Sequence, residues 1–217
     1  MTMMKTLAFA GAMAVMAGTG YASTVDTTYS TTSGGDVSIT QGSLAKPSQS
    51  AVRFSMNGTN TTVSNLLGDF YAFCVDLGTF IQSPTTYTVQ NDMFDSTRVG
   101  KIQNLFDSSY STALTATQNS AFQAALWTLV YDDVTINDNG GGWYTTAQGY
   151  LTAAAGWTGG QLWDLTFLNG HGANPASQNL VTASTHVAPV PLPAAGLLLL
   201  GGLGGLGIVA RRRNKTA

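Results

Sequence analysis

The one cysteine of the sequence, Cys74, is the side chain best suited to nucleophilic chemistry. A free cysteine is most often buried and structural, so a packing role is the first interpretation to consider. If residues 70–77 form a strand, Cys74 lies on the face opposite to Phe73 and Val75, away from the bulkiest side chains. Whether Cys74 is reactive then depends on the groups that the fold brings to it.

A second unusual residue, Gln123, lies in an apolar segment with helical periodicity. At about 100° per residue, Phe122 and Val130 fall on one apolar arc that Trp127 extends, and Gln123 falls inside it. The amide therefore faces apolar neighbours. Because a buried amide without hydrogen-bond partners costs roughly 1–3 kcal/mol, Gln123 indicates either a local polar network or a covalent role.

The order and spacing of these two motifs resemble the Cys-Gln thioester domains of bacterial surface adhesins. The residues that carry the resemblance are Phe73-Cys74-Val75 and, 49 residues after the cysteine, Gln123, Ala125, Leu126 and Trp127. The similarity covers about residues 68–133, and Phe122 departs from it because the family commonly has Thr at that place. The resemblance implies a bond between the Cys74 sulfur and the Gln123 side-chain carbonyl, formed with loss of ammonia.

Such a bond makes chemical sense only in a folded domain. A fold that holds the sulfur against the amide carbon replaces a bimolecular encounter by proximity. Burial beside Phe73 and Trp127 would keep water from the product. An amine, such as a lysine on a neighbouring molecule, could then attack the carbonyl and stay attached through Gln123. The resemblance thus implies a single-use covalent adhesin, which is not an enzyme and has no catalytic residues and no cofactor.

The N-terminus has the pattern of a secretory signal peptide, over residues 1–22. Lys5 is followed by an apolar run from Leu7 to Ala17 and by small residues ahead of a cleavage site after Ala22. The alternative, a buried N-terminal helix, would need a polar face that this run lacks. We therefore expect the protein to be exported.

The C-terminus has the pattern of a membrane-spanning segment. Residues 194–210 are 17 uncharged residues, which is at the short limit for crossing a bilayer, and a basic end at 211–215 follows at once. By the positive-inside bias, Arg211, Arg212 and Arg213 would stay in the cytoplasm while the rest of the chain lies outside. A hydrophobic hairpin in water is the alternative.

The whole tail, residues 190–217, resembles a PEP-CTERM sorting signal of the VPLPA type. The motif is Val190, Pro191, Leu192, Pro193 and Ala194, ahead of the apolar run and the basic end. The resemblance implies recognition and cleavage by an exosortase in a Gram-negative envelope. The protein would pass through the inner membrane and reach the cell surface or the extracellular matrix, and the tail would be removed.

The charge of the chain excludes a nucleic-acid binder. All 11 acidic residues are Asp, and only Lys46, Arg53, Arg98 and Lys101 oppose them outside the two ends, which makes the middle about −7. Charged residues are only 9% of the chain, which argues against a typical cytosolic enzyme. An acidic, sparsely charged body of this kind is typical of exported surface proteins.

The elements that would position Cys74 and Gln123 belong to one domain of the α+β class, residues 23–168. β-Branched and aromatic residues dominate up to Thr88, which predicts an antiparallel β unit, a barrel or a sandwich, that carries Cys74. Helical periods follow, near 97–107, 121–132 and 145–155, and the second of these carries Gln123. Residues 169–189 are rich in Gly, Asn, Ser, Thr and Ala and are interpreted as a linker.

Other candidate sites are weaker. Residues 132–140 offer oxygen ligands, but their spacing misses the EF-hand pattern, so a polar turn is favoured and no metal site is predicted. His171 and His186 fall in the predicted linker, which leaves a cysteine protease without a well-placed base. The tryptophans of residues 143–163 could stack sugars, although clustered aromatic residues more often fill a core.

Two functions from different classes remain open. One is an exported thioester protein that acts in covalent attachment or matrix cross-linking, with amine-bearing surface or matrix molecules as partners. The other is a non-reactive structural or glycan-binding protein of the exopolysaccharide or biofilm layer, in which Cys74 and Gln123 only pack.

Overall fold

The structure is a computed structural model, and it describes residues 23–188. The predicted signal peptide, 1–22, and the predicted sorting tail, 190–217, lie outside the described residues. Among the residues described, no helix is long and apolar enough to cross a membrane.

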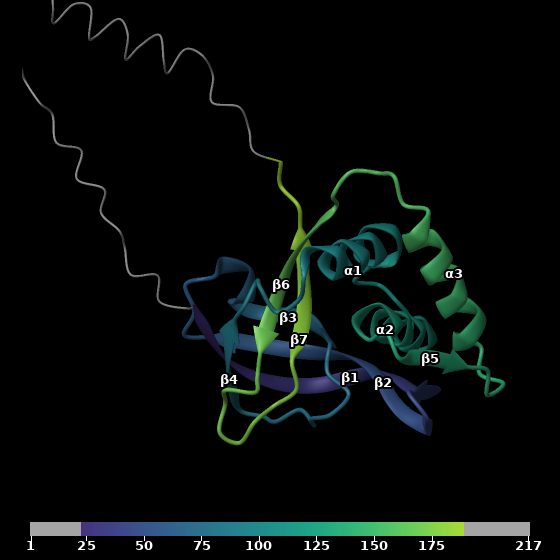
Figure 1. Ribbon diagram of the computed structural model, residues 1–217. Helices are drawn as coiled ribbons and strands as arrows, with labels where there is room; N and C mark the ends of the chain where they lie inside the picture. Colours follow the sequence, from purple (N-terminus) through teal and green to yellow (C-terminus); the bar gives the residue numbers. More distant parts are fainter. Residues whose placement is uncertain (1–22, 189–217) are drawn as a thin grey trace, which may run out of the picture. The chain divides into compact units, whose positions relative to one another are not determined.

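Seven strands and three α-helices make up the described part of the chain (Figure 1). The strands are β1 (Thr24–Gln41), β2 (Leu44–Thr59), β3 (Gly68–Cys74), β4 (Thr85–Val89), β5 (Val134–Asn137), β6 (Trp163–Asn169) and β7 (Leu180–Thr185). The helices are α1 (Ser96–Ser109), α2 (Ala116–Val130) and α3 (Trp143–Ala155), and a short 3-10 helix spans Ser64–Leu66. The α+β class predicted from the sequence is confirmed.

The strands form one antiparallel sheet that closes on itself. Its order is β2-β3-β7-β6-β4-β1-β5, and β1 also pairs with β2, so six strands make a ring and β5 extends it. β1 can pair so widely because it is 18 residues long: its start lies against β4 and its end against β5. Of the two arrangements considered for the β unit, the closed one is present.

α2 is the central helix, and it contacts α1, α3, β1, β2 and β5. Its start is fixed by a capping box, in which Thr115 and Gln118 each bond the other's main-chain N–H. Most of its residues are buried on every side, as in a helix that other elements surround. Figure 1 shows the three helices grouped on one side of the sheet.

An aromatic cluster joins α2 to β3 and α1. The ring of Phe122 lies 4.8 Å from that of Phe73 and 5.0 Å from that of Phe106, and Tyr110 and Tyr150 complete the cluster. These contacts hold the two elements that carry Cys74 and Gln123 against each other.

β3 ends earlier than the sequence indicated. A strand was expected over residues 70–77, but β3 stops at Cys74. A turn follows, in which the main-chain N–H of Gly78 donates to the carboxylate of Asp76 at 2.7 Å. The chain therefore leaves the sheet directly after the cysteine.

The prediction of a linker over residues 169–189 is wrong, because β6 reaches Asn169 and β7 spans Leu180–Thr185. β7 lies inside the sheet between β3 and β6, with Cys74 opposite Leu180. Ser177, Leu180 and Val181 are completely buried. The segment resembles a linker because it is rich in small polar residues. Its only local sign of a strand is the short apolar run Leu180–Val181, and its pairing with β3 is non-local.

The aromatic cluster predicts a strong effect of Phe122→Ala on stability. Removing a fully buried ring leaves a cavity between α2 and β3, and we expect a loss of about 3–5 kcal/mol in the free energy of unfolding. Urea unfolding followed by tryptophan fluorescence would measure it. Phe80→Ala is the control, because Phe80 is 87% exposed and its removal should change little. Equal effects of the two changes would contradict this account of the core.

Candidate functional site around Cys74 and Gln123

The side-chain amide of Gln123 is bonded to the main chain of Cys74 through both of its polar atoms. The Cys74 N–H donates to Gln123 Oε1 at 2.8 Å, and Gln123 Nε2 donates to the Cys74 carbonyl at 2.7 Å. Gln123 is completely buried, so these two bonds satisfy an amide that would otherwise be costly. Gln123 is thus buried, as its apolar neighbours in the sequence indicate, and of the two explanations left open for it a polar network is present.

This arrangement takes the place of a strand pairing. The N–H of Val75 donates to Asn179 on the β7 side at 2.9 Å. Because successive residues of a strand point their main-chain groups to opposite sides, those of Cys74 point toward β2. There they meet Gln123 instead of Val52, the next residue of β2 after the last pair, Arg53 with Phe73. The primary amide thus acts as a substitute peptide unit and ends the pairing of β2 with β3.

The thiol of Cys74 lies in a second set of polar contacts. Cys74 Sγ is 3.0 Å from Gln178 Oε1 and also contacts the main-chain carbonyl of Asp76, two acceptors for its proton. The main-chain N–H of Asp76 donates to the sulfur at 3.1 Å. The sulfur is therefore held by the turn that follows β3 and by the segment that precedes β7.

Burial raises the pKa of the Cys74 thiol to about 12. The Asp76 N–H acts in the opposite direction, the Asp76 carboxylate raises the pKa further, and the indole of Trp127 lowers it. At neutral pH the sulfur is a thiol, so the site does not offer a free thiolate to solvent.

Trp127 and Phe73 enclose the site, as expected from the sequence. Both side chains are 1% exposed. The Trp127 indole N–H is buried and has no hydrogen-bond acceptor, although it lies near enough to the sulfur to act on its pKa. A buried donor of this kind costs free energy unless a further state of the site gives it an acceptor.

Asp76 and His171 form an ionisable pair beside the thiol. His171 Nε2 contacts Asp76 Oδ2 at 2.5 Å and lies 3.4 Å from the Thr79 hydroxyl. Burial alone would raise the pKa of Asp76, but the Gly78 N–H and the His171 imidazole outweigh it, so that pKa lies below its usual range. The interpretation of His171 as a linker residue remote from Cys74 is therefore wrong: the turn between β6 and β7 returns it to the carboxylate next to the cysteine.

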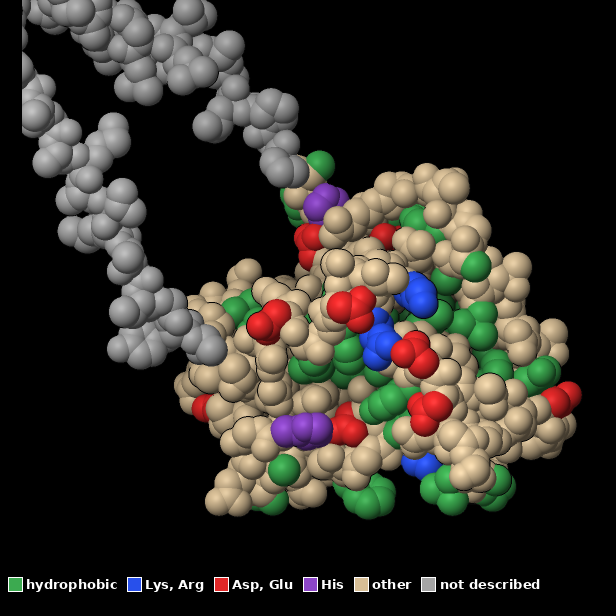
Figure 2. Space-filling view, viewed as in Figure 1, with side chains coloured by type: hydrophobic (Ala, Val, Ile, Leu, Met, Phe, Trp, Pro, Cys, Tyr) green, Lys and Arg blue, Asp and Glu red, His purple; other side chains and the backbone are tan. Residues whose placement is uncertain are grey.

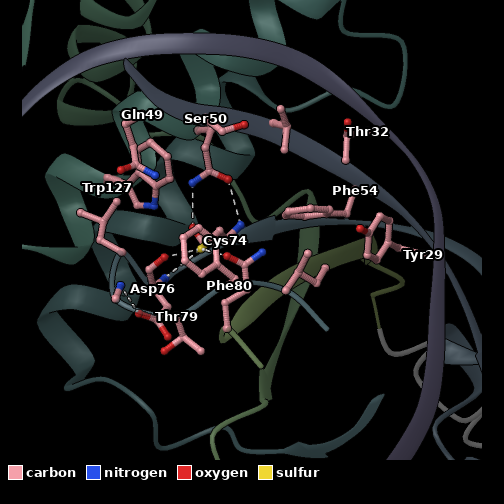
Figure 3. Close-up of a pocket in the computed structure, with 16 residues that line it drawn as sticks. Tyr29, Thr32, Gln49, Ser50, Phe54, Cys74, Asp76, Thr79, Phe80 and Trp127 are labelled. Atoms are coloured by element: carbon pink, nitrogen blue, oxygen red, sulfur yellow. Dashed lines mark hydrogen bonds between the residues drawn. The ribbon is translucent and has the colours of Figure 1, made fainter. Parts of the chain in front are cut away.

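A cavity of about 300 Å³ opens beside Cys74 and Gln123. In Figure 3, Cys74 lies between Gln49 and Ser50 of β2 on one side and Thr79 and Phe80 of the following loop on the other. Asp76 is the one charged residue of its lining, which otherwise consists of apolar and uncharged polar side chains. Figure 2 shows one face of the molecule as largely uncharged, with scattered carboxylates and few Lys or Arg.

The structure brings together every residue that the resemblance assigned to the thioester. Cys74, Gln123, Phe73 and Trp127 are all buried at one place, and Val75, 3% exposed, follows the cysteine with its main chain bonded to the β7 side. Within residues 23–188 no group of three or more His, Cys, Asp or Glu side chains could hold a metal ion. The motif residues 190–194 and 211–213 lie outside the described residues.

Three residues of the site were not selected from the sequence as partners of Cys74. Asp76 falls in the predicted strand 70–77, and Gln178 and His171 fall in the predicted linker. No local pattern marks Gln178 or His171, because both reach the cysteine only through the pairing of β7 with β3. For Asp76, the Asp-x-Gly pattern that it forms with Gly78 is a local sign of a turn.

The lowered pKa of Asp76 predicts a pH-dependent effect of Asp76→Asn on stability. The carboxylate stabilises the fold above its unfolded pKa of about 3.9, and this contribution is lost as pH falls through the lower folded value. Asp76→Asn should therefore be less stable than the wild type at pH 7, and the difference should shrink in acid. Urea unfolding of the wild type and of Asp76→Asn, at pH 7 and in acid, would measure this difference in stability. Asp138→Asn, in an exposed turn, is the control. A difference that does not shrink in acid would contradict the prediction.

Comparison of the chain with protein-family models, curated proteins and solved structures found no match. The chemistry of Cys74 and Gln123 is therefore judged from the contacts described above.

Proposed function

We propose that this chain is an exported surface protein in which Cys74 and Gln123 form an internal thioester, and that it acts in covalent attachment or matrix cross-linking. The observation that carries the proposal is the pair of hydrogen bonds that fixes the Gln123 amide at the residue holding the only thiol. These bonds hold the amide next to the residue whose thiol would attack it, and proximity favours such an attack.

The contacts support a specific course for bond formation. The Cys74 sulfur attacks the side-chain carbonyl carbon of Gln123, and the Cys74 N–H, already bonded to Oε1, stabilises the negative charge that develops on that oxygen. The carbon–nitrogen bond then breaks. The thiol proton leaves with the nitrogen, so the products are the thioester and one ammonia.

The same site supports the later reaction with an amine. A neutral amine attacks the acyl carbon of Gln123, an amide bond forms, and the carbon–sulfur bond breaks. The departing sulfur is met by the Asp76 N–H and the Trp127 indole, and it takes up the proton that the amine loses. Each chain reacts once, so the protein is an attachment device and not a turnover enzyme.

The non-reactive structural protein remains the second candidate, and one observation favours it. The hydrogen bonds of Gln123 would also satisfy a glutamine that only packs in an inert core. The geometry of Cys74 and Gln123 is the same in both cases, so a chemical measurement has to separate them.

Intact mass of the folded chain is that measurement. With the thioester, the protein should be lighter by one ammonia than its sequence, and methylamine should add to Gln123 and release one free thiol. Cys74→Ala should restore the mass of an unmodified glutamine at position 123 and abolish the adduct, because no sulfur is left to attack. Gln123→Ala should also give its plain sequence mass and no adduct, while it keeps its thiol.

Plain sequence masses for the wild type and both variants, under gentle handling near neutral pH, would refute the thioester and leave the structural protein. Resistance to thiol-labelling reagents does not decide between the two candidates. A buried structural cysteine, with its pKa raised to about 12, would resist them equally.

The sorting tail is a separate part of the proposal. We expect mature protein from a host that has an exosortase to lack Arg211, Arg212 and Arg213, and the uncleaved chain to stay in the inner membrane of a host without one. Mass spectrometry of surface and membrane fractions would measure both. Chains that end at Ala217 on the outer surface would contradict cleavage, whatever the state of Cys74.

A further inference from the structure

One part of β2 has an unpaired edge next to the site. β3 pairs with β2 only over Arg53–Gly58, so residues 44–52 of β2 have β1 on one side and no strand on the other among the residues described. Pro47 lies in this part, and proline within a strand is typical of an edge because it cannot donate a main-chain hydrogen bond. Pro47 leaves residues 48–52 as a short stretch able to pair with a further strand.

This free edge borders the cavity beside Cys74. Gln49 and Ser50 lie on one side of the cavity and Phe80, in the loop after β3, on the other (Figure 3), and Val52 and Ile81 also belong to its lining. A segment added to residues 48–52 would continue the line of β3 beyond Cys74. It would then lie directly beside the Gln123 amide that ends the pairing of β2 with β3.

We propose that this edge of β2 binds an extended, lysine-bearing polypeptide segment as an added strand and so delivers the lysine amine to the acyl carbon of Gln123. The inference rests on the proposed thioester and names its partner and its docking surface. In strand addition, main-chain hydrogen bonds supply affinity and side-chain pockets supply specificity. Five edge residues match the usual length of a strand, about 5–6 residues.

Charge complementarity favours a lysine-bearing partner. Asp76, which His171 contacts, is the one charged residue in the cavity lining, and its lowered pKa keeps it anionic at neutral pH. Outside the two ends the chain has 11 Asp against four Lys and Arg, so a cationic segment is attracted to it from a distance. Phe80, 87% exposed at the cavity, adds an apolar contact for the stem of a lysine.

The test compares the rates at which amines add to the folded wild-type chain, measured by intact mass. The probes are an acetylated and amidated octapeptide of Thr and Val with one central Lys, the same peptide with alternate main-chain amides N-methylated, acetyl-lysine methylamide, and methylamine. The first peptide should react at least about tenfold faster than acetyl-lysine methylamide, the effect of roughly two net hydrogen bonds. N-Methylation should remove this advantage, since it removes main-chain donors and leaves the lysine intact.

Two variants of β2 locate the effect on the strand. Ser50→Arg puts a bulky cation on the free edge and should lower the ratio of the octapeptide rate to the methylamine rate. Thr59→Arg is the matched control, at the opposite end of the same strand and away from the cavity, and it should leave the ratio unchanged. The N-methylated peptide needs no variant, so the inference is testable even if Ser50→Arg does not fold.

The outcomes separate this inference from the proposed function. If no amine adds at all, the thioester is absent and both fall. If methylamine adds but the octapeptide, its N-methylated form and acetyl-lysine methylamide react equally fast, the edge has no role and only this inference is overturned. If the chain forms covalent oligomers without peptide and Lys46→Arg abolishes them, the lysine-bearing segment is β2 of a second copy, and the inference stands with that source.

Discussion

The hydrogen bonds between the Gln123 amide and the Cys74 main chain are the constraint on which the rest of the site depends. They tie the central helix α2 to the last residue of β3. If either bond were missing, buried polar groups of Cys74 or Gln123 would be left without partners, at a cost of about 1–3 kcal/mol each. Because the amide occupies the place of a β2 residue, the same contact ends the strand pairing, frees the edge of β2 and leaves room for the cavity.

The position of the thiol follows from what happens just after this contact. With β3 ended at Cys74, the chain turns through Asp76 and Gly78, and the turn presents a main-chain N–H to the sulfur. The segment that precedes β7 supplies Gln178 on the other side, and the turn between β6 and β7 supplies His171 to the Asp76 carboxylate. Burial and the nearby Asp76 carboxylate then both raise the pKa of the thiol.

The sequence predicted those parts of the fold and site that have a local cause. Alternation of β-branched residues before Thr88 and the helical period around Gln123 were enough for the α+β class, and the apolar neighbours of Gln123 were enough to predict its burial. The closure of the sheet, the place of β7 and the partners of the thiol were not predictable in this way. Cys74 meets Gln178 across 104 residues, and no local pattern encodes a contact that depends on which strands become neighbours.

Two further features of this site bear on the proposed thioester. An inert core gains nothing from a cavity against its buried amide, since the atoms that line a void lose their packing contacts. Nor does it gain from a buried indole N–H without an acceptor, as Trp127 has. Both the cavity and the free indole N–H are useful if an amine has to reach the Gln123 carbon and a sulfur anion has to leave from it. The amide alone fits either function, and the cavity and the unsatisfied donor beside it favour the reactive one.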